Sequence, residues 1–203
     1  LWLPYAHPAA PSPVSALMSG VMIKTAIYLI IRIFVVGQGT SANIALGLLI
    51  LGIITSIWGI LFALIQNDLK KLLAYSSVEN IGIIIIGIAT ALYFKACGFS
   101  VISNLATAAV LFHCFNHGIF KALLFLCSGS INRFTHSQNM SEFGGFGKKM
   151  PMTMFTFILA SMSIWALPPL NGFASKWLIY QTLFQGCLHS QNDLVKALFV
   201  TSI

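Results

Sequence analysis

The chain has 203 residues, of which 58% are hydrophobic and only 7% are charged. Because soluble domains carry about 25% charged residues, this composition excludes a soluble protein and predicts an integral membrane protein surrounded by a lipid bilayer. The net charge of +7 does not indicate a nucleic-acid-binding protein, since such proteins gather their basic residues on a solvated face. Four ionisable side chains lie inside apolar runs instead: Lys24, Glu79, Lys121 and Lys176.

The two ends of the chain are typical of a piece of a longer protein. The chain begins at Leu1 without a methionine or a signal peptide, and it ends inside the apolar run 194–203. We therefore expect residues 1–203 to be a fragment that forms a single transmembrane domain. The four cysteines form no Cys-x-x-Cys pair, so we interpret them as small buried hydrophobic residues; they are Cys97, Cys114, Cys127 and Cys187.

Apolar runs separated by short polar segments predict an all-α polytopic membrane protein. The expected spans cover residues 14–36, 44–65, 72–94, 101–131 and 152–185, followed by an incomplete span over 194–203. Four prolines lie within residues 1–13, where we expect no regular helix. One crossing needs about 20 residues, so we expect the long span 101–131 to bend or break near Asn116–Gly118. Pro168 and Pro169 predict a break in the fifth span near residues 168–172.

The polar segments 66–71 and 132–151 fall on the same side of the membrane if successive spans alternate in direction. That side holds five basic residues, namely Lys70, Lys71, Arg133, Lys148 and Lys149, whereas the other side holds mainly Arg32, Lys95 and Lys196. Cytoplasmic loops of membrane proteins carry an excess of lysine and arginine. We therefore expect a multi-pass protein of the cell inner (cytoplasmic) membrane, with segments 66–71 and 132–151 in the cytoplasm.

His113, His117 and Lys121 recur at a spacing of four residues within one apolar segment. On an α-helix this spacing places all three on one face, about 6 Å apart along the axis. Ionisable groups at membrane depth cost about 2.5–3.5 kcal/mol on insertion scales, so they usually face a bundle interior or a wet cavity. Because histidine titrates near neutral pH and has two ring nitrogens, the row is typical of a proton relay.

Three other interpretations of this row stay open. Two histidines at positions i and i+4 can bind a metal ion, but no third ligand is visible, and Lys121 would repel a cation. The pair could bind haem together with a histidine of another helix, although no other predicted span offers a well-placed one. Both histidines could also be structural residues of the core. We expect neither a bound metal nor a redox cofactor.

Three further ionisable residues are candidates for proton transfer. Lys24 lies about ten residues from either end of its span, beyond comfortable reach of water by snorkelling, and its alternative role is a structural ion pair with a carboxylate outside this fragment. Glu79 is a proton carrier or a partner for a lysine, unless Ser76 or Asn80 holds it near the interface. Lys176 follows the expected helix break, where it serves proton exit or gating, or else caps free carbonyl groups.

Four stretches of the sequence resemble one family, the proton-conducting antiporter-like subunits of respiratory complex I and its relatives. They are residues 2–17, 68–77, 113–126 and 171–176, which occur in the family's order and span essentially the whole chain. Complex I subunits usually carry a histidine–methionine pair where Glu79 and Asn80 stand. The Glu-Asn form and the run Pro168–Phe173 are similar to the large antiporter-like subunit of group 4 membrane-bound hydrogenases, as in formate hydrogenlyase and hydrogenase-four complexes.

The resemblance implies a fold of about fourteen helices with two inverted five-helix repeats, of which this fragment covers the last helix of the first repeat and most of the second. In that fold Lys24 is the central lysine of the first half-channel. His113, His117 and Lys121 form a central bridge on a broken helix, and Lys176 is the terminal lysine on a second broken helix. Some members carry glutamate at that last position, and a glutamate and a lysine of earlier helices complete the family's path.

The resemblance also implies a function. It is that of a proton-translocating membrane subunit of a redox-driven complex of the hydrogenase, formate hydrogenlyase or complex I type. Its expected partners are other membrane subunits and a peripheral electron-transfer arm, and charge coupling along the row of titratable groups transmits the energy. The main alternative is an Mrp-type cation/proton antiporter subunit. A haem-binding membrane subunit and a purely structural anchor are two further alternatives.

Overall fold

The computed structural model describes residues 2–37, 41–189 and 193–202, and within these ranges no β-strand forms. The long elements are α4 (Ala42–Leu64), α5 (Leu69–Ala96), α6 (Ser100–Thr135), α8 (Pro151–Ile164), α9 (Asn171–His189) and α10 (Asp193–Ser202). A further helical stretch runs without interruption through α2 (Ser12–Leu17), the π-helical turn η1 (Met18–Met22), α3 (Ile23–Ile30) and a second π-helical segment η2 (Ile31–Val36). Three short elements complete the chain: α1 (Leu3–Ala9), the 3₁₀ turn η3 (Met140–Glu142) and α7 (Phe146–Lys149).

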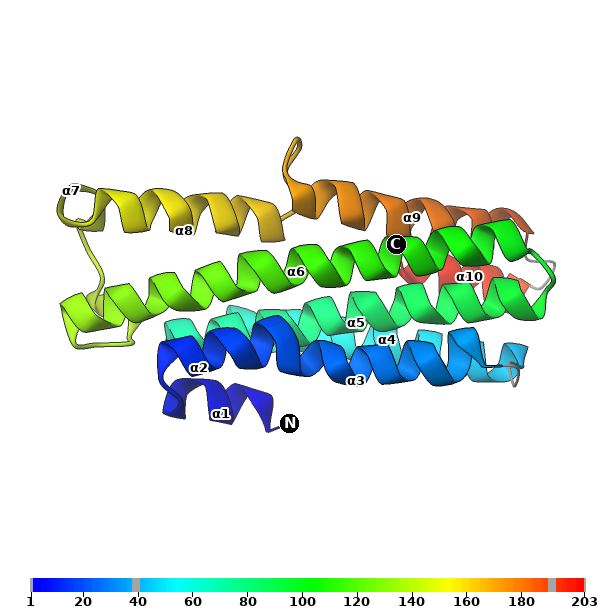
Figure 1. Ribbon diagram of the computed structural model, residues 1–203, viewed down its shortest axis with the longest axis horizontal. Helices are drawn as coiled ribbons and strands as arrows, with labels where there is room; N and C mark the ends of the chain where they lie inside the picture. The colour runs from blue at the N-terminus through cyan, green and yellow to red at the C-terminus, as the bar shows by residue number, and fades with distance from the viewer. Residues whose placement is uncertain (1, 38–40, 190–192, 203) are drawn as a thin grey trace.

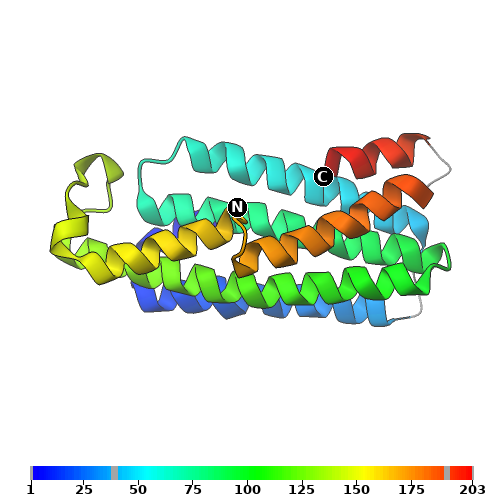
Figure 2. The same cartoon turned by 90° about the horizontal axis from the view of Figure 1, so that it is seen from above.

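The long helices form one bundle in which α5 and α6 occupy the centre (Figure 1). Within the described ranges, four stretches are long and apolar enough to cross a membrane: 12–36, α4, α5 and α6. Helices α8 and α9 lie end to end along α6 (Figure 1). Figure 2 shows α10 beside α4, against the end of α9. Large apolar side chains cover the outer face of α4, as expected for a helix in contact with lipid or with another membrane segment.

The expectation that residues 1–13 form no regular helix is wrong. Residues Leu3–Ala9 form α1, and α2 begins at Ser12. Pro4 and Pro13 each lie in the first turn of a helix, where the backbone N–H has no intrahelical partner to lose. Pro8 lies in the last turn of α1, so its ring removes only the final hydrogen bond of a short helix.

No break interrupts α6 near Asn116–Gly118, so the broken helix that the resemblance implies for this row is wrong. Helix α6 is continuous over 36 residues, which corresponds to about 54 Å and exceeds the thickness of a membrane core. The polar side chain of Asn116 bonds the backbone of α9 rather than its own helix, so it does not interrupt α6. Gly118 permits a close approach to η1, because a Cβ atom there would lie 3.1 Å from the Gly20 carbonyl oxygen.

The chain leaves helical geometry between α8 and α9, at the proline pair where the sequence predicts a break. Helix α8 ends at Ile164, and α9 begins at Asn171. Gly172 packs directly on the carbonyl group of Ser163, at a distance that leaves no room for a side chain. The last carbonyl groups of α8 therefore lie within the bundle, beside the first turn of α9, where they need partners from the protein or from water.

Segments 66–71 and 132–151 meet at one end of the bundle. The backbone N–H of Leu69 donates to the Gln138 carbonyl at 3.1 Å, and that of Met140 donates to the Asn67 carbonyl at 2.8 Å. The Asp68 side chain caps α5 by accepting hydrogen bonds from the backbone of the next two lysines. The basic residues of both segments are thereby gathered at the same end of the molecule.

Helices α4 and α5 are in backbone contact through glycine. A Cβ atom at Gly82 of α5 would lie 2.5 Å from the Ser56 nitrogen of α4, and one at Gly59 would lie 2.5 Å from the Glu79 nitrogen. Small residues allow such close approach between membrane helices, where van der Waals packing replaces the hydrophobic effect as the main attraction. This contact fixes the position of α5, and with it the polar residues that α5 carries.

We expect Gly82→Ala to separate α4 from α5, because its methyl group would meet backbone atoms that cannot move independently. Overpacking of this kind costs about 1–3 kcal/mol, so the thermal unfolding midpoint of the full-length protein should fall. Gly47→Ala in α4 is the matched control, since nothing lies within 4 Å of its added Cβ. Equal unfolding midpoints for the two variants would contradict the close contact.

Candidate functional site

Four polar residues of α5 lie next to one another in the middle of the bundle: Ser76, Ser77, Glu79 and Asn80. All except Glu79 are buried, and the Glu79 side chain is 19% exposed. Three of these side chains contact three different neighbouring segments, whereas the Asn80 amide bonds the Ser76 carbonyl of its own helix at 2.8 Å. This polar segment of α5 organises the candidate site.

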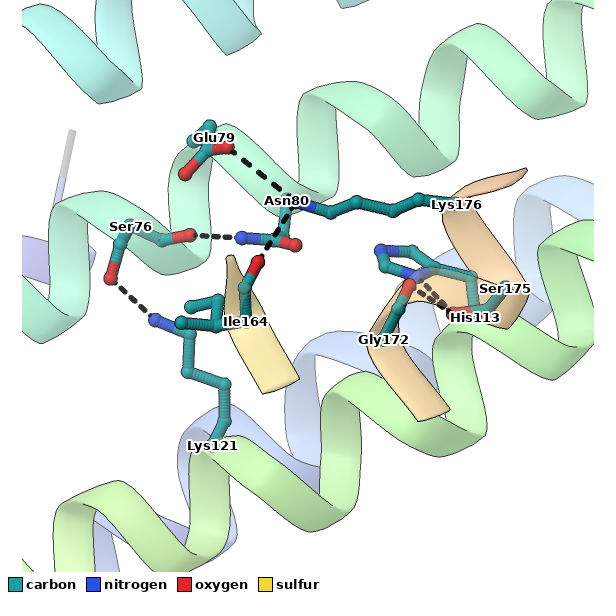
Figure 3. Close-up of polar contacts among 9 residues, drawn as sticks. All are labelled: Ser76, Glu79, Asn80, His113, Lys121, Ile164, Gly172, Ser175 and Lys176. Carbon is teal, nitrogen blue, oxygen red and sulfur yellow. Dashed lines mark hydrogen bonds and ion pairs between the residues drawn. The ribbon is translucent and has the colours of Figure 1, made fainter. Parts of the chain in front are cut away.

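Lys121 of α6 is bound to α5 by two hydrogen bonds. Its side chain is 0% exposed. The Nζ atom donates to the Ser76 Oγ atom at 2.6 Å and to the Leu73 carbonyl oxygen at 2.9 Å (Figure 3 shows the first of these bonds). Buried ammonium groups need such partners, because a charge without hydrogen bonds is expensive in a medium of low dielectric constant.

Helix α3, which carries Lys24, lies on the opposite side of α6 from α9 (Figure 1), and the Lys24 side chain is only partly buried. Its Nζ atom donates to the Ser19 carbonyl oxygen in the π-helical turn η1. The side chain lines an otherwise apolar open groove of about 700 Å³ between the stretch 12–36 and α6, together with Gly20, Cys114 and Gly118. Among the described residues no carboxylate forms an ion pair with Lys24.

A pair of serines joins the surroundings of Lys24 to those of Lys121. The Ser19 and Ser77 hydroxyl oxygens lie 3.0 Å apart, and both side chains are 0% exposed. The Ser77 hydroxyl also donates to the Leu73 carbonyl oxygen at 3.0 Å, the same oxygen that accepts from Lys121. Sequence reasoning missed this contact, because a serine within a membrane helix is common and its spacing carries no signal.

Lys176 of α9 forms an ion pair with Glu79 of α5 across the helix break. Their Nζ and Oε1 atoms are 4.0 Å apart, and the Lys176 amine also donates to the Ile164 carbonyl at the end of α8, at 3.1 Å (Figure 3). Lys176 therefore caps a free carbonyl and pairs with a carboxylate at the same time. Ser76 and Asn80 bond backbone carbonyls rather than Glu79 in the described structure, which favours the interpretation of Glu79 as the partner of a lysine.

His113 of α6 is held by the first turn of α9. Its Nδ1 atom lies 3.0 Å from the Ser175 Oγ atom, and the Ser175 hydroxyl lies 3.2 Å from both the Asn171 and the Gly172 carbonyl oxygens. The Asn116 amide donates to the same Asn171 carbonyl at 3.0 Å. Side chains of α6 thus bond the first turn of α9, so His113 and Asn116 attach the histidine row to the helix that follows the break.

His117 lies between His113 and Lys121 on the same face of α6 and is 0% exposed. The ring centroids of the two histidines are 6.2 Å apart. Both ring nitrogens of His117 and the Nε2 atom of His113 are buried and lack a hydrogen-bonding partner in the described part of the chain. Buried polar atoms without partners cost about 1–3 kcal/mol each, so we expect water molecules to bond them.

A third buried histidine, which sequence reasoning missed, lies at the end of the bundle that carries the basic segments. His7 of α1 is 0% exposed and stacks on Phe125 of α6 with ring centroids 4.5 Å apart. Burial, together with the positive charges of Lys121 and Lys70, lowers the pKa of His7 to about 4. The ring is therefore neutral at pH 7.

The structure thus connects four of the six predicted site residues into two groups, and His113 and His117 lie on α6 between them. Lys24 and Lys121 belong to the first group, which the two serines join, and Glu79 and Lys176 form the second. Both groups include contacts with the polar segment of α5: the first with Ser76 and Ser77, the second with Glu79, which lies within one helical turn of them. Among the described residues no three histidine, cysteine, aspartate or glutamate side chains converge as they would around a metal ion.

The sequence matches over residues 1–202 the family described as "NADH:quinone oxidoreductase/Mrp antiporter, TM". The chain belongs to this family. The match covers nearly the whole sequence, and it includes all of the candidate site residues from Lys24 to Lys176. The predicted membership of the antiporter-like subunits is confirmed.

Two proteins of Escherichia coli (strain K12) are similar to the chain. It is 41% identical over 186 residues to "Hydrogenase-4 component B", and 38% identical over 184 residues to "Formate hydrogenlyase subunit 3". Among solved structures, that of the Mrp complex from Dietzia sp. DQ12-45-1b superposes with a TM-score of 0.82 at 26% identity. The predicted fold class, an all-α polytopic membrane protein of the antiporter-like type, is confirmed.

The chain spans less than a third of the length of these two curated relatives. It covers 28% of hydrogenase-4 component B and 30% of formate hydrogenlyase subunit 3, while 90% and 91% of the chain itself is aligned. In the comparison with the Mrp complex, 99% of this chain corresponds to 36% of the other. The antiporter-like fold of the relatives therefore contains further segments beside the helices described above.

Proposed function

We propose that this chain is part of the proton-translocating membrane subunit of a redox-driven complex of the hydrogenase-4, formate hydrogenlyase or complex I type. Protons would pass through Lys24, Glu79, His113, His117, Lys121 and Lys176, with water between them. One observation carries this proposal: three lysines from different helices converge on the polar segment of α5. Lys121 bonds Ser76 and Lys176 pairs with Glu79. Ser77 contacts the hydroxyl of Ser19, whose carbonyl group accepts from Lys24. The polar segment of α5 is largely buried within the bundle.

The mechanism that we propose is electrostatic. Charges a few ångströms apart interact strongly where the dielectric constant is low, so a proton that arrives on one lysine displaces the proton of its neighbour. A neutral histidine can accept a proton on one ring nitrogen while it releases one from the other. His113 and His117 lie on α6 between Lys121 and the Lys176 region, which suits them to carry protons between the two groups.

We further propose partners and an orientation. The relatives are named as components of hydrogenase 4 and of formate hydrogenlyase, so the partners would be other membrane subunits and a peripheral electron-transfer arm. The end of the bundle with segments 66–71 and 132–151 carries the larger number of lysines and arginines in its connecting segments. By the positive-inside rule this end would face the cytoplasm of a cell whose inner membrane holds the protein.

A second candidate function is that of an Mrp-type cation/proton antiporter subunit. The observation that favours it is the TM-score of 0.82 with the Mrp complex, because the same buried residues would serve exchange of a proton for another cation. Purification of the full-length protein separates the two functions. Recovery with a hydrogenase or quinone-reducing module supports the redox-driven complex, whereas recovery with antiporter subunits and without redox centres supports the alternative.

Lys24→Ala tests the proposed function in the intact complex. We expect roughly tenfold slower proton translocation in inverted membrane vesicles supplied with the electron donor, because a positioned proton carrier is lost. Lys148→Ala is the matched control, since Lys148 is an exposed lysine of a connecting segment outside the bundle interior. Proton translocation by Lys24→Ala at the rate of the control would remove Lys24 from the path.

A further inference from the structure

We propose that the hydroxyl groups of Ser19 and Ser77 form the bridge through which a proton moves between Lys24 and Lys121. This inference rests on the proposed function, because it assigns the connection between two of its lysines. Neither serine is ionisable, and neither stands out in the sequence. Their role follows from where the helices place them.

The bridge is a direct contact between two separate parts of the bundle. Ser19 lies in η1 and Ser77 lies in α5, 58 positions apart in the chain, yet their hydroxyl oxygens are separated by only 3.0 Å. Both side chains are 0% exposed. A contact between two hydroxyl groups in such a place is unlike the other serine hydrogen bonds of the described helices, most of which return to a carbonyl of their own helix.

Each end of the bridge lies beside one of the lysines. The Lys24 Nζ atom contacts the carbonyl oxygen of Ser19 itself, so a rotation of the lysine side chain carries the amine toward the hydroxyl of the same residue. At the other end, the Ser77 hydroxyl and the Lys121 amine share one acceptor, the Leu73 carbonyl oxygen, at 3.0 and 2.9 Å. Two donors on one oxygen are neighbours of each other.

The π-helical turn η1 accounts for this geometry on the side of Lys24. Its wider hydrogen-bonding pattern, in which the Ile23 backbone N–H reaches back to the Met18 carbonyl, changes the register of the helix just before Lys24. Ser19 thereby directs its hydroxyl toward α5, while its carbonyl group accepts from the Lys24 amine.

A hydroxyl pair can transfer a proton, whereas a carbonyl group cannot. Protonated Lys24 gives one proton to the Ser19 oxygen as the Ser19 hydrogen passes to the Ser77 oxygen and the Ser77 hydrogen passes to a neutral Lys121 amine, directly or through one water molecule. Lys24 ends as a neutral amine, Lys121 as an ammonium group, and both serines remain hydroxyl groups with reversed orientations. Rotation of the two O–H bonds restores the starting state, and no redox partner is needed.

Hydroxyl deletion in the intact complex tests the bridge. We expect Ser19→Ala and Ser77→Ala each to slow proton translocation per assembled complex roughly tenfold or more, because each removes a positioned group that both donates and accepts. The double variant should be no slower than either single variant, since all three interrupt the same bridge. Thr90→Val is the matched control: the Thr90 hydroxyl is equally buried, also belongs to α5, and bonds only the Ile86 carbonyl of its own helix.

The substitution Ser77→Thr distinguishes a loss of proton transfer from a disturbance of helix packing. Ser77→Thr keeps the hydroxyl group while it adds a methyl group, so it should translocate protons faster than Ser77→Ala although it disturbs packing more. Where Ser19→Ala lowers assembly, Ser77→Ala and Ser77→Thr decide the question, because they leave η1 unchanged. Native translocation rates in both alanine variants, with Lys24→Ala still impaired, would overturn the bridge and leave the proposed function standing. Native rates in Lys24→Ala as well would overturn both.

Discussion

Replacement of Lys121 by alanine is expected to slow proton translocation by the intact complex roughly 100-fold, at the lower end of the effects seen when a positioned proton-transfer group is removed. Lys121 is the most enclosed lysine of the site, with 0% exposure and hydrogen bonds to Ser76 and Leu73. Alanine leaves no group at this position that can hold a proton. It also removes the positive charge through which the first group of residues acts on the second.

Proton uptake by inverted vesicles, normalised to the amount of assembled complex, measures this effect. Lys70→Ala is the matched control, because Lys70 is likewise a buried lysine, but it lies in the first turn of α5 and its amine donates to the Ala10 carbonyl at the end of the bundle. We expect the control to retain most of the native rate. Equal translocation rates for the two variants would show that the loss of any buried lysine slows translocation, and that the position of Lys121 on α6 has no special role.

The ionisable residues of the site could be predicted from the sequence because their free-energy cost of membrane insertion makes them rare in apolar segments. A lysine or glutamate inside an apolar run opposes membrane insertion, so Lys24, Glu79, Lys121 and Lys176 are found from composition and position alone. The partner of Glu79 could be named only as a lysine, since the sequence does not say which helices touch. The structure identifies that partner as Lys176.

The hydroxyl and amide groups of the site could not be predicted in the same way. Ser19, Ser77 and Ser175 are residues that membrane helices accommodate at little cost, because each can bond its own backbone when no other partner is near. Their roles depend on the register between helices, which is set by contacts such as Gly82 on Ser56. Such contacts follow from three-dimensional packing and leave no periodic signal in the sequence.

The two errors about local structure have a related cause. The break near Asn116–Gly118 is expected from the length of the apolar span, and the absence of helix in residues 1–13 is expected from the prolines; neither expectation includes contacts between helices. In the bundle Asn116 finds an acceptor on α9, and α1 packs on α5 with the Lys70 amine bonded to the carbonyl that follows α1. Tertiary contacts therefore override weak local preferences at both places.

The ion pair between Glu79 and Lys176 leads to the second large effect that we expect. Glu79→Gln leaves the Lys176 amine with only the Ile164 carbonyl as its described partner, and Lys176→Met leaves a carboxylate within the bundle. Each single change should slow proton translocation roughly tenfold and lower the thermal stability of the complex. Removal of both charges should destabilise the complex less than the two single changes combined, because neither charge then lacks its partner.

A double-mutant cycle on thermal stability measures this coupling, which we expect to be about 1–2 kcal/mol. The pair Asp193–Lys196 provides the control: its atoms are closer, at 3.7 Å, but the Asp193 side chain is 100% exposed. Water and salt screen exposed pairs, so the cycle Asp193→Asn and Lys196→Met should show no measurable coupling. Additive effects at Glu79 and Lys176 would mean that these two charges act separately. The helix break would then place Lys176 to cap Ile164 alone, and the path would need another partner for its second group.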